Sequence, residues 1–156
     1  MSDKIEFLLH KANEEQDHHE VVRIASENRA ILNKNSLNLS IRSAYMIGDF
    51  VNSLDLSEQA SRLHPDEPIF ALFIARSHNK MGEKDKAISV YERLSASHPD
   101  VQEPYIMLAR ANYSGGDYEA TIDKLDEWPG VLDEHAQMLI LKARSFQALA
   151  SDDEAY

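Results

Sequence analysis

Four arginines recur at one fixed interval and are the residues of this sequence best suited to binding chemistry. Each follows the previous one by 34 residues: Arg42, Arg76, Arg110 and Arg144. A guanidinium group is planar and permanently charged, and it binds carboxylate or phosphate through two parallel hydrogen bonds. The recurrence predicts a row of anion-binding side chains, provided that the repeated segments present each arginine on the same surface.

Residues one helical turn away from each arginine would share that surface. They are Asn38, Leu72, Ile106 and Ile140 on the amino-terminal side, and Tyr45, Asn79, Tyr113 and Gln147 on the carboxy-terminal side. Arginine flanked by tyrosine, amide and aliphatic side chains suits an extended peptide or a partner helix with acidic and apolar side chains. The structural alternative is that each arginine pairs with a nearby acid such as Asp49, Glu83, Glu103 or Asp117. An exposed pair of that kind stabilises by only about 0 to 1 kcal/mol. The sequence leaves both interpretations open.

Glycines and prolines follow the same interval and indicate what positions the arginines. Gly48, Gly82 and Gly116 are 34 residues apart, and so are Pro65 and Pro99, each inside a His-Pro-Asp tripeptide. A fixed period of this length is typical of stacked helix pairs. In each pair the glycine supplies the left-handed residue that ends the first helix, and the proline stops the second.

The segment 68–101 is the clearest copy of the repeat. Its apolar residues recur at spacings of three and four, which predicts helices near 69–80 and 85–96. Small side chains at Ala75 and Ala87 allow the two helices to approach closely.

This segment resembles the tetratricopeptide repeat family. The resemblance is carried by Ala75, Ala87, Tyr91 and Pro99, whereas His78 stands where the family usually has tyrosine. It implies an all-α, right-handed α-solenoid of antiparallel helix pairs, in which the first helices line a concave inner surface. It also implies that the residue after the small crossing residue points toward that surface, so that the arginines would form a ladder along a groove.

The rest of the chain is predicted to form one solenoid with this segment. Segments 34–67, 68–101 and 102–135 are repeats, the last with a second helix cut short by Trp128-Pro129-Gly130. Segment 1–33 is a degenerate first helix pair or cap, since Gln16-Asp17-His18 replaces the glycine turn. Segment 136–156 is expected to be an incomplete repeat, with 152–154 opening its second helix. This favours a native chain that continues beyond Tyr156 over the alternative that the last helix is itself a cap.

Composition limits the classes of function. A net charge of −11 disfavours nucleic acid and anionic membranes, and no basic run offsets it. The sequence has no cysteine and no apolar run of about 18 residues, so we expect a cytoplasmic chain without disulfides or a membrane span. Neighbouring side chains in Asp17-His18-His19-Glu20 diverge on a helix and suit a cap better than a metal site. Within these residues we find no catalytic group, and we predict no enzyme activity for them, no cofactor and no metal, whereas a longer parent chain could be an enzyme.

The predicted function is therefore a protein–protein interaction scaffold that binds a partner segment along the arginines. The resemblance suggests an alternative, an N-terminal recruitment or dimerisation domain of a larger enzyme such as a bacterial glycosyltransferase or sulfotransferase. A homodimer through the open C-terminal helix is a third possibility, because a last helix without a neighbour exposes its apolar stripe.

Overall fold

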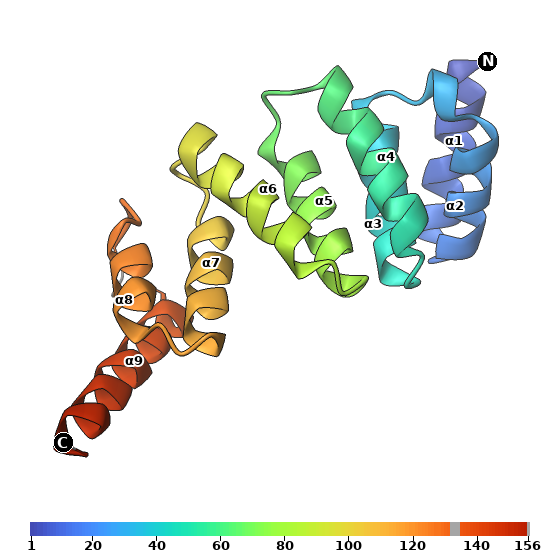
Figure 1. The fold of residues 1–156 in the computed structure, drawn as a ribbon. Coiled ribbons are helices and arrows are strands. Elements are labelled where there is room, and N and C mark those ends of the chain that lie inside the picture. The colour runs from blue at the N-terminus through green and yellow to red at the C-terminus, as the bar shows by residue number, and fades with distance from the viewer. Residues whose placement is uncertain (132–134, 156) are drawn as a thin grey trace. The chain divides into compact units, whose positions relative to one another are not determined.

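The structure is a computed structural model that describes residues 1–131 and 135–155 (Figure 1). The described residues form α-helices joined by short turns, with one short 3₁₀ helix and no strand. The helices are α1 (Ser2–Glu14), α2 (His18–Glu27), η1 (Arg29–Ile31), α3 (Lys34–Met46), α4 (Phe50–Leu63), α5 (Pro68–Lys80), α6 (Lys84–Ser97), α7 (Glu103–Ser114), α8 (Tyr118–Asp126) and α9 (Ala136–Glu154). They confirm the all-α prediction.

The chain divides into two compact units, Met1–Ala87 and Ile88–Tyr156, with the boundary inside α6. In the first unit each helix from α1 to α5 packs on the next, and α3 also contacts α1 and α5. In the second unit α8 packs between α7 and α9, which touch each other as well. The first helices of the pairs therefore form one layer within each unit: α1, α3 and α5 in the first, α7 and α9 in the second (Figure 1).

Glycine ends the first helix of three successive pairs, as the sequence predicts. Gly48, Gly82 and Gly116 have φ angles of 79°, 80° and 80°. A Cβ atom at any of them would meet nothing within 4 Å, so backbone conformation is what requires glycine there. After two of these glycines, an aspartate caps the next helix: Asp49 accepts from the N–H of Asn52, and Asp117 from that of Ala120.

The first helix pair makes the same turn without glycine. Gln16 adopts φ 56°, and Asp17 accepts a hydrogen bond of 3.0 Å from the N–H of Glu20. Asp17 is thus a helix cap, as predicted. Helix α2 ends at Glu27, four residues shorter than α4, and η1 follows it.

The core of the first unit is built from large aliphatic and aromatic side chains and, where helices cross, from small ones. Leu37, Ile41, Leu56 and Phe70 are at most 1% exposed and belong to one cluster. At the crossing of α4 and α5, the Ser77 Oγ donates to the Ser53 Oγ at 3.1 Å. The residues 34 and 68 positions after Ser53 are Ala87 and Thr121, and both are buried. Small side chains therefore occupy this position in three successive repeats.

In the second unit α8 ends at Asp126, which confirms that Trp128-Pro129-Gly130 shortens this helix. The Trp128 ring packs edge-on against the Tyr105 ring, with centroids 5.4 Å apart. A Cβ at Gly130 would lie only 2.3 Å from the Trp128 Nε1, so glycine is needed for the chain to pass this ring.

Helix α9 differs from the prediction. Residues 152–154 continue the helix instead of opening a new one, and Ala155 is its C-cap residue. The reason lies at Ala150, which follows Gly116 by one period. Alanine disfavours the left-handed conformation that ends the earlier first helices, so the helix runs on.

Candidate functional site

Two of the recurring arginines are open to solvent. Arg42 lies on α3 and Arg144 on α9, and both side chains are exposed. Within residues 1–131 and 135–155, neither forms a hydrogen bond or an ion pair. Both guanidinium groups therefore retain all their donors for an external ligand.

Arg76 on α5 is half-buried and lies over an aromatic ring. Its Cζ is 4.9 Å from the centroid of the Phe73 ring, a cation–π geometry. The Tyr45 ring, from α3, meets the same Phe73 edge-on at 5.6 Å. These contacts join two first helices of the first unit around one of the predicted site residues.

Arg110 joins the two first helices of the second unit. It extends from α7, and its Nη2 donates to the Oε1 of Gln137 on α9 at 3.0 Å. The partner is a neutral amide, so the positive charge of the exposed arginine is not neutralised by this contact.

Three of the acids that could have paired with the arginines instead make contacts within their own turns. Asp49 and Asp117 cap α4 and α8. Glu83 binds the Lys86 Nζ at 2.9 Å and accepts from the His78 Nδ1 at 2.6 Å. The Lys86 ammonium, and after it the His78 imidazole, hold the pKa of Glu83 below its usual value.

Some of the flanking residues serve the packing of the helix pairs. Tyr45 packs edge-on against Phe50, and Tyr113 against Tyr118, with ring centroids 5.3 and 5.2 Å apart. Each of these contacts joins the two helices of one pair. Leu72 is 7% exposed and belongs to the interior. The α5–α6 pair has no such aromatic contact, because Asn79 and Lys84 stand where the α3–α4 and α7–α8 pairs have their two rings. There the hydrogen bond between His78 and Glu83 joins α5 to the turn before α6.

The other flanking residues remain accessible. Ile106 and Asn38 are half-buried, whereas Asn79, Ile140 and Gln147 are exposed. The Asn38 Oδ1 is itself buried and has no hydrogen-bond partner among the described residues.

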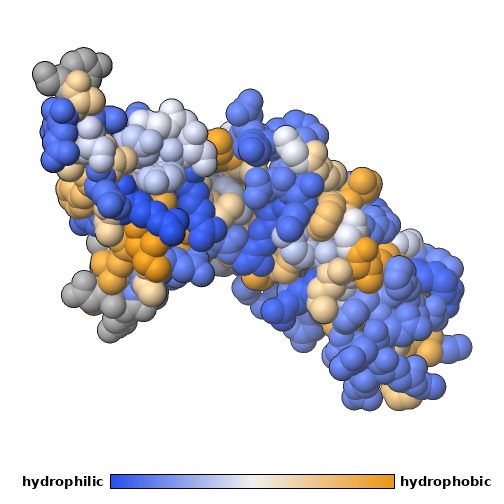
Figure 2. Space-filling view, turned by 90° about the horizontal axis from the view of Figure 1, so that it is seen from below, coloured by the Kyte–Doolittle hydropathy of each residue, from blue (hydrophilic) through white to orange (hydrophobic). Residues whose placement is uncertain are grey.

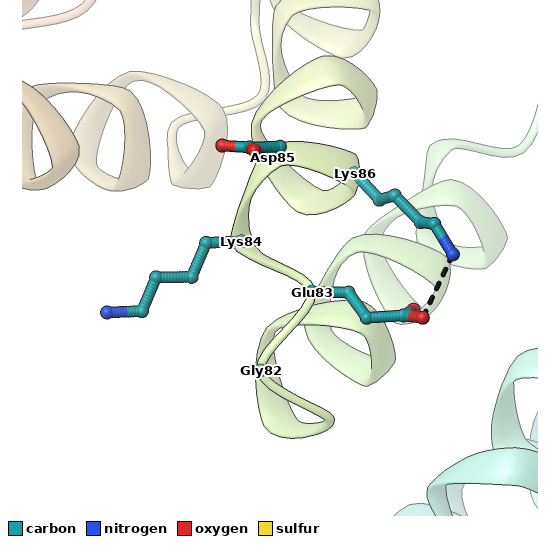
Figure 3. Close-up of a pocket in the computed structure, with 5 residues that line it drawn as sticks. All are labelled: Gly82, Glu83, Lys84, Asp85 and Lys86. Carbon is teal, nitrogen blue, oxygen red and sulfur yellow. Dashed lines mark hydrogen bonds and ion pairs between the residues drawn. The ribbon is translucent and has the colours of Figure 1, made fainter.

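A surface depression of about 320 Å³ lies at the turn between α5 and α6, lined by Gly82, Glu83, Lys84, Asp85 and Lys86 (Figure 3). Lys86 turns toward Glu83, whereas Lys84 and Asp85 extend away from them. Because the charged groups diverge, this depression has no set of side chains that could grip one ligand.

A second pocket, of about 300 Å³, lies between α7 and the beginning of α9. It is lined by Gln102, Ile106, His135, Ala136 and Gln137. Of these, the sequence singled out Ile106 alone. Gln102 lies one turn before Ile106, so extending the pattern of flanking residues by one turn would have found it. His135 does not belong to that pattern, so no periodic signal points to it.

Neither a metal site nor a membrane span occurs in the described part of the chain. It contains no group of three His, Cys, Asp or Glu side chains able to hold a metal ion. None of its helices is both long and apolar enough to cross a membrane.

Helix pairs closed by glycine turns, with the first helices of each unit in one layer, are the architecture of helical-repeat proteins. Residues 74–100 match the family model described as Tetratricopeptide repeat. The match covers one helix-turn-helix segment of the chain, and it is the segment that the sequence singled out as the clearest copy of the repeat.

Solved structures support the fold over almost the whole chain. A crystal structure of MamA protein aligns with a TM-score of 0.80 and 14% sequence identity, covering 99% of this chain and 85% of that chain. The structure of MamA MSR-1 C2 aligns with a TM-score of 0.69 at 14% identity, covering 99% and 90%. No curated protein sequence matches the chain. At this level of identity the likeness concerns the fold.

Proposed function

We propose that the chain is a protein-interaction scaffold whose first helices bind an extended segment of a partner protein. The segment carries acidic side chains for the arginines and apolar side chains for the positions beside them. The observation that supports this best is the exposure of Arg42 and Arg144, neither of which has a partner among the described residues, while Asp49, Glu83 and Asp117 are used in the turns.

The chemistry of the partner follows from charge and hydrogen bonding. The chain as a whole carries a charge of −11, so it repels a uniformly acidic partner. Isolated carboxylates between apolar residues gain the two-pronged contact with arginine at a smaller long-range penalty. The proposed role is binding and requires no catalytic group.

The test uses labelled peptides of about twelve residues, in which glutamate alternates with leucine, and a second set with lysine in place of glutamate. We expect the full chain to bind the acidic set and not the basic set. The double substitution Arg42→Glu and Arg144→Glu is expected to weaken binding of the acidic set at least tenfold, about 1.4 kcal/mol. Fluorescence anisotropy measures the dissociation constants.

A matched control changes the net charge by the same amount elsewhere. Arg62 on α4 and Arg93 on α6 are exposed arginines on second helices. Substituting both by glutamate is expected to leave peptide binding within a factor of about two to three. Equal losses from the two double variants would mean that only net charge matters, and would sink the proposal.

A specific observation also favours self-association through α9, as a second candidate. Leu139, Ile140 and Phe146 are 37%, 52% and 54% exposed. Exposed alanines recur beside them at intervals of seven residues, at Ala136, Ala143 and Ala150. Figure 2 shows apolar side chains gathered on the part of the second unit that holds α8 and α9.

Small residues at heptad spacing allow two helices to pack closely, which suits a second copy of the same helix. We expect the wild-type chain to sediment with twice the monomer mass at high micromolar concentration. The variant Phe146→Glu is expected to remain a monomer, because the pairing would bury its carboxylate. Wild-type protein that stays monomeric at millimolar concentration would exclude this candidate.

A further inference from the structure

The pocket between α7 and the beginning of α9 has the chemistry of a site for one acidic side chain. Its volume of about 300 Å³ is at the lower end of the range for small-molecule sites, so it suits one long side chain. The lining contains two amides, one imidazole and two apolar side chains, and no acid. The polar groups that line it are therefore able to donate hydrogen bonds without repelling an anion.

Gln137 is oriented by its contact with Arg110. Because the Arg110 Nη2 donates to the Gln137 Oε1 at 3.0 Å, the amide oxygen is occupied and the NH₂ group is left as the free end of the side chain. The same contact holds the Arg110 guanidinium next to Gln137, which lines the pocket. An amide donor and a positive charge are thus fixed next to each other before any ligand arrives.

His135 is held by aromatic packing. Its ring lies edge-on to the Trp128 ring with centroids 6.1 Å apart, and Trp128 in turn packs against Tyr105 at 5.4 Å. On the α7 side, the Gln102 Nε2 donates weakly to the Met138 Sδ at 3.2 Å, which uses one of its two N–H groups. Both side chains are therefore restrained by contacts that leave donors available.

Ile106 and Ala136 supply the apolar part of the pocket. Ile106 is half-buried against the core of this unit, so its position is fixed by packing. A glutamate side chain matches this division, because its two methylene groups can lie on Ile106 while its carboxylate reaches Gln137 and Arg110. Phosphate would carry about two charges into a site with one permanent cation and neutral amides, and a purely apolar residue would leave the amides unpaired.

We propose that this pocket anchors a glutamate side chain of the bound partner, through the amides of Gln102 and Gln137 and the guanidinium of Arg110. The assignment rests on the proposed function, because the glutamate belongs to the partner segment. It adds a specific residue and a specific place, which a row of arginines alone does not provide.

The experiment is an NMR titration of the full chain with two blocked tripeptides, acetyl-Leu-Glu-Leu-amide and acetyl-Leu-Gln-Leu-amide. We expect the glutamate peptide to shift the side-chain amide signals of Gln102 and Gln137 and the ring signals of His135, with a dissociation constant on the order of 1 mM. The glutamine peptide is expected to bind at least tenfold more weakly. Shifts of equal size with both peptides, or shifts that avoid these three residues, would overturn the assignment.

The variants Gln137→Leu and Arg110→Leu form a cycle with the two peptides. Each variant is expected to bind the glutamate peptide about tenfold more weakly and the glutamine peptide less than twofold more weakly, because only the carboxylate uses the altered donor. Losses that are the same for both peptides would instead indicate a change in the fold, and would contradict the assignment.

Two further arms separate this assignment from the proposed function and from binding of free carboxylates. In one outcome, the Arg42 and Arg144 double variant loses binding of the twelve-residue peptide, but the Gln137 and His135 signals of the wild-type chain do not respond to the tripeptide. That outcome would leave the proposed function standing and would rule out the pocket as a glutamate site. Acetate at the same concentration is expected to give less than one tenth of the tripeptide shift, because it lacks the methylene and leucine contacts. Equal shifts with acetate would mean that the pocket binds any carboxylate, and would overturn the assignment to a partner residue.

Discussion

Replacing Phe70 by alanine is expected to lower the free energy of unfolding by about 3 to 5 kcal/mol, the usual cost of removing a buried phenylalanine. Phe70 is 1% exposed and lies on α5 in the same cluster as Leu56 and Ala60 of α4. Its ring also contacts the ring of His64, with centroids 6.0 Å apart. The substitution would leave a cavity between two helices that form one of the main contacts of the first unit. Urea denaturation followed by circular dichroism measures the change.

Phe7→Ala is the matched control, because it removes the same side chain from an exposed site on α1. Phe7 is 67% exposed, so this variant is expected to stay within about 0.5 kcal/mol of wild type. The single tryptophan, Trp128, lies in the second unit, and its fluorescence follows the unfolding of that unit separately. If Phe70→Ala and Phe7→Ala have the same midpoint, Phe70 does not belong to a packed core.

The sequence predicted the helix pairs because their punctuation is local and periodic. At Gly48, Gly82 and Gly116 the turn needs a positive φ angle, which glycine adopts easily. This requirement is local, so it can be predicted without knowing the rest of the fold. The same holds for the short α8, since a proline directly after Trp128 stops a helix whatever packs on it. The end of α9 was predicted wrongly for the opposite reason. Periodicity placed a turn at Ala150, but the residue that would make the turn is absent there.

The candidate site was less predictable, because the position of a residue in the repeat does not determine what its side chain contacts. Tyr45 and Tyr113 occupy positions flanking the arginines, yet their rings join the helices of their own pairs. Arg42 and Arg144, found from the arginine period, are exposed, and their part in binding stays a prediction. The pocket was missed because Gln102 precedes α7 and His135 precedes α9, and neither position belongs to the repeated pattern of arginines and flanking residues.

The serines at helix crossings show how far a repeat position constrains its residue. Ser53 is fully buried on α4, and its Oγ accepts from Ser77 on α5 at 3.1 Å. Ser53→Leu is expected to be about 1 to 3 kcal/mol less stable than Ser53→Ala, because the larger side chain would force α4 and α5 apart. Ser53→Ala should cost about 1 to 3 kcal/mol, because it removes the acceptor of the buried Ser77 hydroxyl. Thermal and urea unfolding of the three proteins give the comparison.

A double variant separates the loss of the hydrogen bond from the change in volume. Replacing Ser53 and Ser77 together by alanine removes both partners, so neither hydroxyl is left unpaired, and the cost should be close to or below that of Ser53→Ala alone. Alanine already occupies the equivalent of Ser53 one repeat later, at Ala87, where it is 3% exposed. We therefore expect the crossing to require a small side chain and to tolerate the loss of polarity. Leucine as stable as alanine at this position would show that the helices are not in close contact there.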